Sequence, residues 1–272
     1  MRPISLAHLT VMDADPIALI DAGAAGGFDA VGLRIVAPMP SDRIVHVIND
    51  PPLQRRIRER LDATGLTILD IEAVWLTAST NVEDLVPALE VGARLGAKFL
   101  LVVGNDPDSG RTKANFAAIC ERARAVGLGV VLEPMSYVHL STIAKATDVL
   151  NAVGQPNAKL LIDALHFHRA GGQARDIAQL DPGLLPYMHL CDAPTAKPEP
   201  DRLRVEGRSE RFYPGQGELP LEDFVQAFPG DTPAAVEAPC AQYATLPVIE
   251  RGRLCGEATR SFLRALKRGR QA

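Results

Sequence analysis

The chain has 272 residues, of which 47% are hydrophobic and 23% are charged, an ordinary balance for a globular protein that buries a large core without cross-links. This composition excludes a disordered or fibrous chain. The formal net charge of −4 provides no basic surface for a polyanion, so we expect no nucleic-acid partner.

The first residues of the chain show no secretion or membrane signal. The stretch Met1–Pro16 carries one Arg, no sustained apolar core and no small-residue cleavage site, and no apolar run approaches the ~18 residues that would cross a membrane. We therefore expect neither export nor a membrane-bound state.

Eight short apolar segments recur along the chain, and they are continuous Val/Ile/Leu runs instead of alternating ones. Such runs are typical of parallel strands that are buried on both faces. The segments are Ile4–Leu9, Ala30–Val36, Thr67–Leu76, Phe99–Val103, Gly129–Met135, Lys159–Ala164, Tyr187–Ala193 and Ala234–Ala238.

Helical segments separate these strands, and Gly65, Gly96, Gly127 and Gly154 close several of them. Eight strand–helix units without a linker predict a single-domain (β/α)8 TIM barrel over residues 1–272, because such barrels run to about 250 residues. An open sheet would want a Gly-rich phosphate loop after the first strand, where this sequence has none. The predicted helices are Pro16–Gly26, Leu53–Thr64, Val82–Leu95, Lys113–Val126 and Thr142–Val153.

One connection, Pro194–Gly217, is long, polar and rich in Pro, Arg and Glu. Long loops at the C-terminal end of barrel strands commonly bind or cover substrate. We therefore expect a substrate-facing flap, with a variable surface insertion as the alternative.

Ionisable residues come at the ends of four of the later apolar runs: Glu133, Asp163, His189 and Glu237. Such groups are costly to desolvate unless they are paired or bind a cation. The C-terminal ends of barrel strands converge on one mouth, which brings the four together. Two Glu, one Asp and one His suit Mn²⁺, Mg²⁺, Co²⁺ or Zn²⁺. The sequence thus predicts one bound divalent metal ion.

The early strands place His8, Arg34, Glu72 and Trp75 near the same mouth. Arg34 stands inside an apolar run and needs a partner, either an acidic substrate or Glu72 in a structural ion pair. Trp75 forms an apolar wall for a sugar ring or packs in the core. We treat all four as candidate substrate contacts.

The cysteines Cys120, Cys191, Cys240 and Cys255 lie far apart and form no Cys-x-x-Cys pair. Neither a zinc ribbon nor a disulfide framework is indicated, and a reducing, cytoplasmic location is expected.

Over nearly its whole length the chain resembles the xylose isomerase-like TIM barrel superfamily of sugar phosphate isomerases and epimerases. The residues that carry the resemblance are Glu133, Asp163–His166, His189 with Asp192, Pro214–Gly217 and Glu237. The resemblance implies that Glu133, Asp163, His189 and Glu237 bind one divalent metal, with Glu133 and Glu237 as the acid/base pair. It also implies that an Arg before the turn, such as Arg211, faces the substrate or its phosphate.

Two further residues belong to the matching motifs. His166 can reach a second metal or a substrate hydroxyl, and we favour the hydroxyl. Asp192 can orient His189 or His166, or cap the next segment. The early strand ends lack the additional His ligands of endonuclease IV, a superfamily member, so a three-zinc DNA-repair site is not expected.

A metal with two carboxylates matches removal of a proton next to a carbonyl, with the cation stabilising the enediolate. We therefore expect an isomerase or epimerase acting on a small sugar-like or polyol-like substrate. The alternative is a dehydratase or lyase acting on a keto-inositol, keto-sugar or dehydroshikimate-like substrate. A barrel that only binds a ligand is disfavoured by the complete set of four ionisable residues. The sequence leaves a homo-oligomer open.

Overall fold

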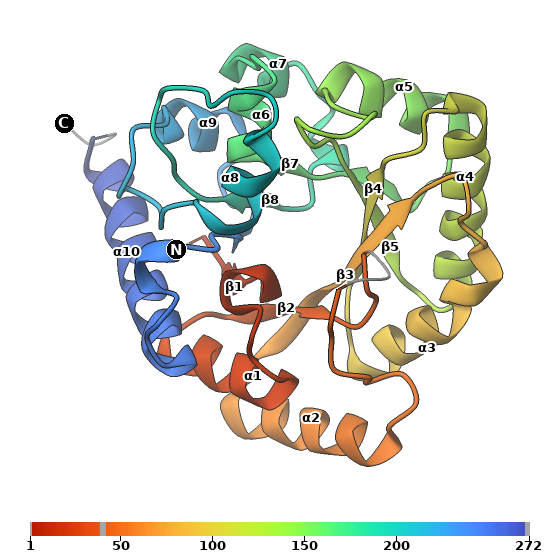
Figure 1. The fold of residues 1–272 in the computed structure, drawn as a ribbon, viewed down its shortest axis with the longest axis horizontal. Coiled ribbons are helices and arrows are strands. Elements are labelled where there is room, and N and C mark those ends of the chain that lie inside the picture. Colours follow the sequence, from red (N-terminus) through yellow and green to blue (C-terminus); the bar gives the residue numbers. More distant parts are fainter. Residues whose placement is uncertain (1, 39–41, 270–272) are drawn as a thin grey trace.

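The computed structural model of the chain describes residues 2–38 and 42–269. Its parallel strands form a nearly closed barrel with helices around the outside (Figure 1). This arrangement confirms the predicted (β/α)8 TIM barrel.

The strands follow the predicted order. They are β1 (Ile4–Leu6), β2 (Ala30–Arg34), β3 (Thr67–Leu76), β4 (Phe99–Gly104), β5 (Gly129–Glu133), β6 (Ala158–Leu160), β7 (Ile162–Asp163), β8 (Met188–Leu190) and β9 (Ala234–Val236). The predicted strand Lys159–Ala164 is two short pieces, because the chain breaks at Leu161 between pairing with β5 and pairing with β8. The two ends of the nine-stranded sheet are thus consecutive in the chain.

Several strands are shorter than predicted. The first strand ends at Leu6 instead of Leu9, because the chain turns into the 3-10 helix η1 (His8–Val11). Val11 remains fully buried there. An apolar run therefore continues in the core after the backbone has left the sheet, and hydrophobicity alone does not mark the end of the strand.

The helices surround the barrel, and several have the caps that fix where they begin. Asp50 caps α2 before Pro51, which places the start of that helix two residues ahead of the prediction. The elements are α1 (Pro16–Ala25), α2 (Pro51–Thr64), η2 (Val82–Leu85), α3 (Val86–Leu95), α4 (Ser109–Ala125), α5 (Ile143–Val153), α6 (Ala164–Arg169), α7 (Ala174–Ala178), η3 (Pro182–Leu184), α8 (Leu203–Ser209), α9 (Leu221–Ala227), η4 (Ala241–Tyr243) and α10 (Val248–Gly269).

The barrel has an apolar interior as well as an apolar layer under the helices. Residues that alternate along a strand point to the same face. The residues two positions before the four predicted ligands, Val131, Leu161, Tyr187 and Ala235, all belong to one buried apolar cluster. This cluster fills the barrel below the strand ends. Among the described residues, no helix is long and apolar enough to cross a membrane.

Candidate active site

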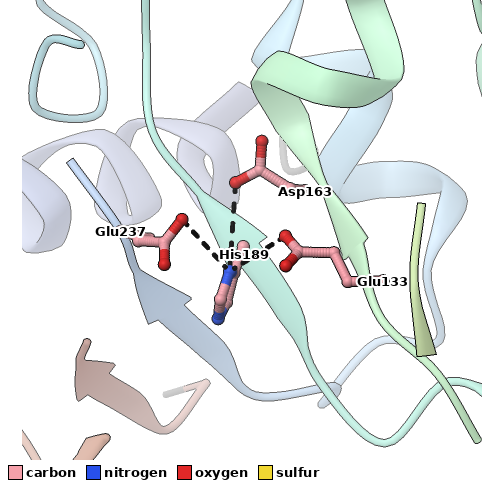
Figure 2. A group of neighbouring side chains, drawn as sticks. All are labelled: Glu133, Asp163, His189 and Glu237. Atoms are coloured by element: carbon pink, nitrogen blue, oxygen red, sulfur yellow. Dashed lines mark ion pairs between the residues drawn. The ribbon is translucent and has the colours of Figure 1, made fainter. Parts of the chain in front are cut away.

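Glu133, Asp163, His189 and Glu237 come together at the C-terminal ends of neighbouring strands. Figure 2 shows the three carboxylates around one nitrogen of His189. The distances from His189 Nδ1 are 3.5 Å to Glu133, 3.7 Å to Glu237 and 4.0 Å to Asp163. All four side chains are buried, and one donor atom from each lies within 4.8 Å of the others.

The donor set suits a divalent cation. Donors that bind a common ion at about 2.1 Å lie at most about 4.2 Å apart, so small side-chain rotations would close the observed spacing. Glu133 Oε1 and both ring nitrogens of His189 are buried and have no hydrogen-bond partner among the described residues. A cation between the carboxylates would supply a partner for Glu133 Oε1 and for His189 Nδ1.

The charges within the cluster also favour a cation. Burial alone would lower the pKa of His189, but Glu237, Glu133 and Asp163 raise it to about 10. Burial raises the pKa of Glu133 to about 7, although His189 acts in the opposite direction. The carboxylates therefore favour a positive charge at the position of the His189 proton.

The 3-10 helix η1, near the start of the chain, fixes the position of Glu237 at the end of β9. Thr10, in η1, donates its hydroxyl to Val236 O at 2.8 Å and accepts from Ala238 N–H at 2.9 Å. The residues on both sides of Glu237 are thus held by the segment that follows β1.

Arg211 lies inside this cluster. The sequence placed it on a substrate-facing flap, but the structure buries its side chain completely. Its guanidinium is 2.8 Å from Asp163 and 3.1 Å from Glu237, and its Nε donates to Gly207 O at 2.7 Å. Burial alone would raise the pKa of Asp163, but Arg211 and the neighbouring histidines lower it.

His166 lies next to Arg211 at the start of α6. Its backbone N–H donates to Asp163 Oδ1 at 2.9 Å, so Asp163 caps this helix with one oxygen. The other oxygen of Asp163, Oδ2, bonds to Arg211. Ser136 Oγ lies 3.3 Å from His166 Nδ1, and the Tyr137 ring packs edge-on at 5.1 Å. Burial lowers the pKa of His166 to about 3, which keeps the imidazole neutral.

Asp192 holds the turn after β8. Its carboxylate accepts from the backbone N–H groups of Gly215, Gly217 and Leu219, and of the adjacent Ala193. Asp192 therefore caps the segment that follows it, as one of the two predictions had it, and does not orient the imidazole of His189 or His166. Gly217 is required here because a Cβ at this position would lie 2.5 Å from Asp192 Oδ1.

The loop Pro194–Gly217 is anchored and contains the helix α8. Glu206, on α8, forms a buried ion pair of 2.6 Å with Arg169, which also donates to Pro194 O at 2.7 Å. On the other side of the helix, Arg208 pairs with Asp42 at 3.2 Å and Arg204 stacks over Trp75 at 5.6 Å. The loop therefore reaches the mouth through its arginines.

The early-strand residues His8, Arg34 and Glu72 bond to one another. Arg34 and Glu72 form a buried ion pair of 2.8 Å, which is the structural alternative considered for Arg34. His8 Nδ1 accepts from Arg34 N–H, while His8 N–H donates to Glu72 Oε1. His8 Nε2 lies 3.0 Å from Ala14 O, so both ring nitrogens have protein partners.

A small pocket of about 20 Å³ opens onto Glu133 and Glu237. Its volume exceeds only slightly the ~10–15 Å³ that one water needs, so a substrate would have to displace covering side chains. Sequence reasoning missed Met135, Tyr137 and Arg208, because β5 ends at Glu133 and strand alternation gives no signal beyond it. The pocket is lined by Leu9, Arg34, Pro38, Ala73, Trp75, Leu101, Val103, Glu133, Met135, Tyr137, Arg208 and Glu237.

Comparison with known proteins identifies a matching family model and several similar proteins. A family model described as a xylose isomerase-like TIM barrel matches residues 20–265. Inosose isomerase from Bacillus velezensis is 28% identical over 107 residues, which are 39% of this chain and 36% of that protein. A 3-dehydroshikimate dehydratase from Pseudomonas aeruginosa is 25% identical over 219 residues, which are 76% of this chain and 33% of that protein.

These curated relatives are longer than the regions they share with this chain, which cover between 33% and 40% of their lengths. Among solved structures, a protein named IolI with a bound zinc atom has a TM-score of 0.78 at 18% identity, covering 96% of this chain and 98% of that one. The structural match supports the barrel fold, and the sequence relatives are enzymes.

Proposed function

Because this chain belongs to the xylose isomerase-like TIM barrel family, we propose that it is a divalent-metal-dependent isomerase or epimerase acting on a small sugar-like or polyol-like substrate. One observation carries the proposal: Glu133, Asp163, His189 and Glu237 converge in a single buried cluster. Four separate strand ends supply these groups, and packing alone gives no reason to bury three carboxylates together.

These four side chains would hold the ion. When bound, a divalent ion supplies a Lewis acid that polarises the substrate carbonyl and stabilises negative charge on its oxygen. Arg211 supports this role, because it fixes Asp163 and Glu237 through ion pairs from within the protein.

Glu133 and Glu237 are proposed as the acid/base pair. They approach from opposite sides of His189 (Figure 2), so a carbon held between them would be accessible to one carboxylate on each face. One Glu removes the proton next to the carbonyl, the electrons of the C–H bond form the enediolate double bond, and the π electrons of the carbonyl move onto its oxygen. The other Glu returns a proton.

The pocket walls would position the substrate and exclude water. Trp75, Leu101 and Met135 present apolar surface, which suits the C–H face of a sugar or polyol. Arg208 and Arg34 offer guanidinium donors from the side walls. His166, which lines a separate pocket and is neutral, is proposed to contact a hydroxyl.

A second function, a dehydratase or lyase, is favoured by one observation. The match to a 3-dehydroshikimate dehydratase extends over 76% of this chain. The same enediolate can expel a hydroxyl from the next carbon, in which case the second Glu protonates the departing oxygen and water is released. The site residues would be the same, and the difference would lie in the substrate.

Proton exchange in D₂O tests the proposal. Protein loaded with Mn²⁺, Co²⁺, Mg²⁺ or Zn²⁺ would be incubated with ketohexoses, keto-inositols and 3-dehydroshikimate, and the products followed by NMR. An isomerase or epimerase incorporates deuterium next to the carbonyl without loss of water, whereas a dehydratase releases water. Absence of metal-dependent exchange and of dehydration with all of these substrates would contradict the proposed function.

A further inference from the structure

One buried carboxylate near the cluster is not explained by the proposed function. Asp70, on β3, is only 1% exposed. Its Oδ2 accepts a hydrogen bond from the hydroxyl of Tyr187, which belongs to the apolar layer below the cluster. Its Oδ1 has no hydrogen-bond partner among the described residues. Such a carboxylate is expensive to bury unless it serves another group.

His189 presents a matching donor. Its Nδ1 faces the three carboxylates, and Figure 2 shows the other ring nitrogen pointing away from them. This nitrogen, Nε2, is buried and has no partner among the described residues. Tyr187 is the preceding inward residue of the same chain segment, and its ring centroid lies 5.8 Å from that of His189. The hydroxyl of Tyr187 thus connects Asp70 to the part of the barrel below His189.

Between β3 and β8 the sheet contains β2, β1 and β9, and the register partners nearest these two groups are small residues. A Cβ at Gly32 of β2 would lie 2.5 Å from Asp70 Oδ1, so the carboxylate oxygen rests directly over the backbone of that strand. Ala235 of β9 is the register partner of His189 on one side and of Ser5 on the other.

Ser5 therefore shares the inner face with His189, and its buried Oγ also has no partner among the described residues. Asp70 and His189 interact electrostatically as well: burial raises the pKa of Asp70 to about 7, and His189 acts in the opposite direction. Three buried polar residues, Asp70, Ser5 and His189, thus share the inner face of the barrel. Their neighbouring inward positions on β2 and β9 are Ala30, Gly32 and Ala235.

We propose that Asp70 is a positioning residue for His189: its Oδ1 receives the Nε2–H of the imidazole through one bound water that Ser5 Oγ helps to hold. Metal-bound histidines usually donate their second N–H to a carboxylate, a carbonyl or a water, which fixes the ring orientation and the tautomer. Asp70 would keep the proton on Nε2 and the lone pair of Nδ1 directed at the three carboxylates. The inference rests on the metal site of the proposed function.

The test is the affinity for Co²⁺, followed by its visible absorption and by competition with a chelator. In Asp70→Asn the side chain keeps its shape, while the charge that would orient His189 is lost. We expect the affinity for Co²⁺ to fall by about 10- to 100-fold, the range for partners of this kind, with a changed absorption spectrum. The matched control is Asp106→Asn, which removes another buried carboxylate, bonded to Arg111 instead of facing the cluster.

The outcomes separate the two proposals. If the wild-type chain binds no Co²⁺, the metal site of the proposed function fails. If the wild type binds Co²⁺ and Asp70→Asn binds it equally well with the same spectrum, the positioning role is overturned and the metal site stands. A lower melting temperature of the metal-free Asp70→Asn protein with unchanged Co²⁺ affinity would likewise overturn it, since Asp70 would then act only in the packing of the barrel.

A measurement on the wild-type chain covers the case in which Asp70→Asn does not fold. In the Zn²⁺-loaded protein, histidine ¹⁵N NMR should show a metal-bound Nδ1 and a slowly exchanging Nε2–H for His189. A proton on Nδ1, or an Nε2–H that exchanges rapidly, would overturn the proposal. Loss of the signal in His189→Gln assigns it.

Discussion

Arg211 and Asp163 form an ion pair of 2.8 Å in which neither side chain is exposed to solvent. Since Arg211 also pairs with Glu237, its removal leaves two buried carboxylates without their fixed counter-charge. We expect Arg211→Ala to lower the free energy of unfolding of the metal-free protein by about 3–5 kcal/mol, the range for breaking a buried pair. The loss should be smaller in the metal-loaded protein. Denaturant unfolding with and without metal measures both values.

Arg122→Ala is the control for this change, because Arg122 pairs with Glu83 at the surface with both side chains more than half exposed. Exposed pairs contribute about 0–1 kcal/mol. Equal losses in the two variants would show that the burial of Arg211 has no energetic consequence.

The second prediction concerns the proposed ion itself. Purified protein should bind about one divalent ion per chain, and His189→Ala should lower both the affinity and the metal-dependent rise in melting temperature, because an ion that binds only the folded state shifts its stability. Elemental analysis and thermal unfolding provide the readouts. A metal content and a thermal shift like those of the wild type would remove His189 from the ligand set.

Glu133→Gln and Glu237→Gln test the acid/base pair. Each amide retains a carbonyl oxygen that can coordinate but cannot exchange a proton at neutral pH. We expect each variant to fold and to lose turnover by at least ~10²-fold, the lower end of what a positioned acid or base contributes. Steady-state kinetics with the substrate identified by deuterium exchange measures the loss. Near-normal rates in both variants would place the proton transfer on other groups.

The metal-free protein should lose stability as the pH rises. The folded-state pKa of His189 is raised from 6.5 to about 10, so the contribution of its protonation is complete below pH 6.5 and disappears as the pH approaches 10. Glu133, with a pKa raised from 4.5 to about 7, acts in the same direction at lower pH. Unfolding free energies measured from pH 6 to 10 in the presence of chelator should therefore fall, and less steeply in His189→Gln. Parallel curves would contradict this assignment.

Arg208 tests the contribution of the loop to substrate binding. It lines the pocket with Glu133 and Glu237, while its ion pair with Asp42 is partly exposed. Arg208→Ala should therefore change the unfolding free energy by less than about 1 kcal/mol, but raise KM by roughly tenfold if a charged hydrogen bond to substrate is lost. Arg202→Ala is the control in the same loop, since Arg202 pairs with the exposed Glu210. An unchanged KM in Arg208→Ala would show that the Arg208 side chain does not bind substrate.

The repeated strand and helix pattern was sufficient to predict the barrel, because a buried parallel strand requires a continuous apolar run. The same pattern brought Glu133, Asp163, His189 and Glu237 together, since each lies at or next to the end of such a run. It could not place Arg211, whose partners lie 48 and 26 residues away in the chain. The bonds of Asp192 to Gly215, Gly217 and Leu219 likewise depend on how the loop returns. Long-range contacts of this kind leave no local periodicity.

The two hydrogen bonds of Thr10 on either side of Glu237 have a consequence for the order of synthesis. A nascent chain that has emerged as far as β8 contains Glu133, Asp163 and His189, but the edges of β1 and β8 have no strand between them until β9 pairs with both. Thr10 is made before all four cluster residues and Glu237 is the last of the four, so the final side chain of the cluster is seated in the same event that closes the barrel. A ribosome-bound intermediate would accordingly hold only a partial cluster.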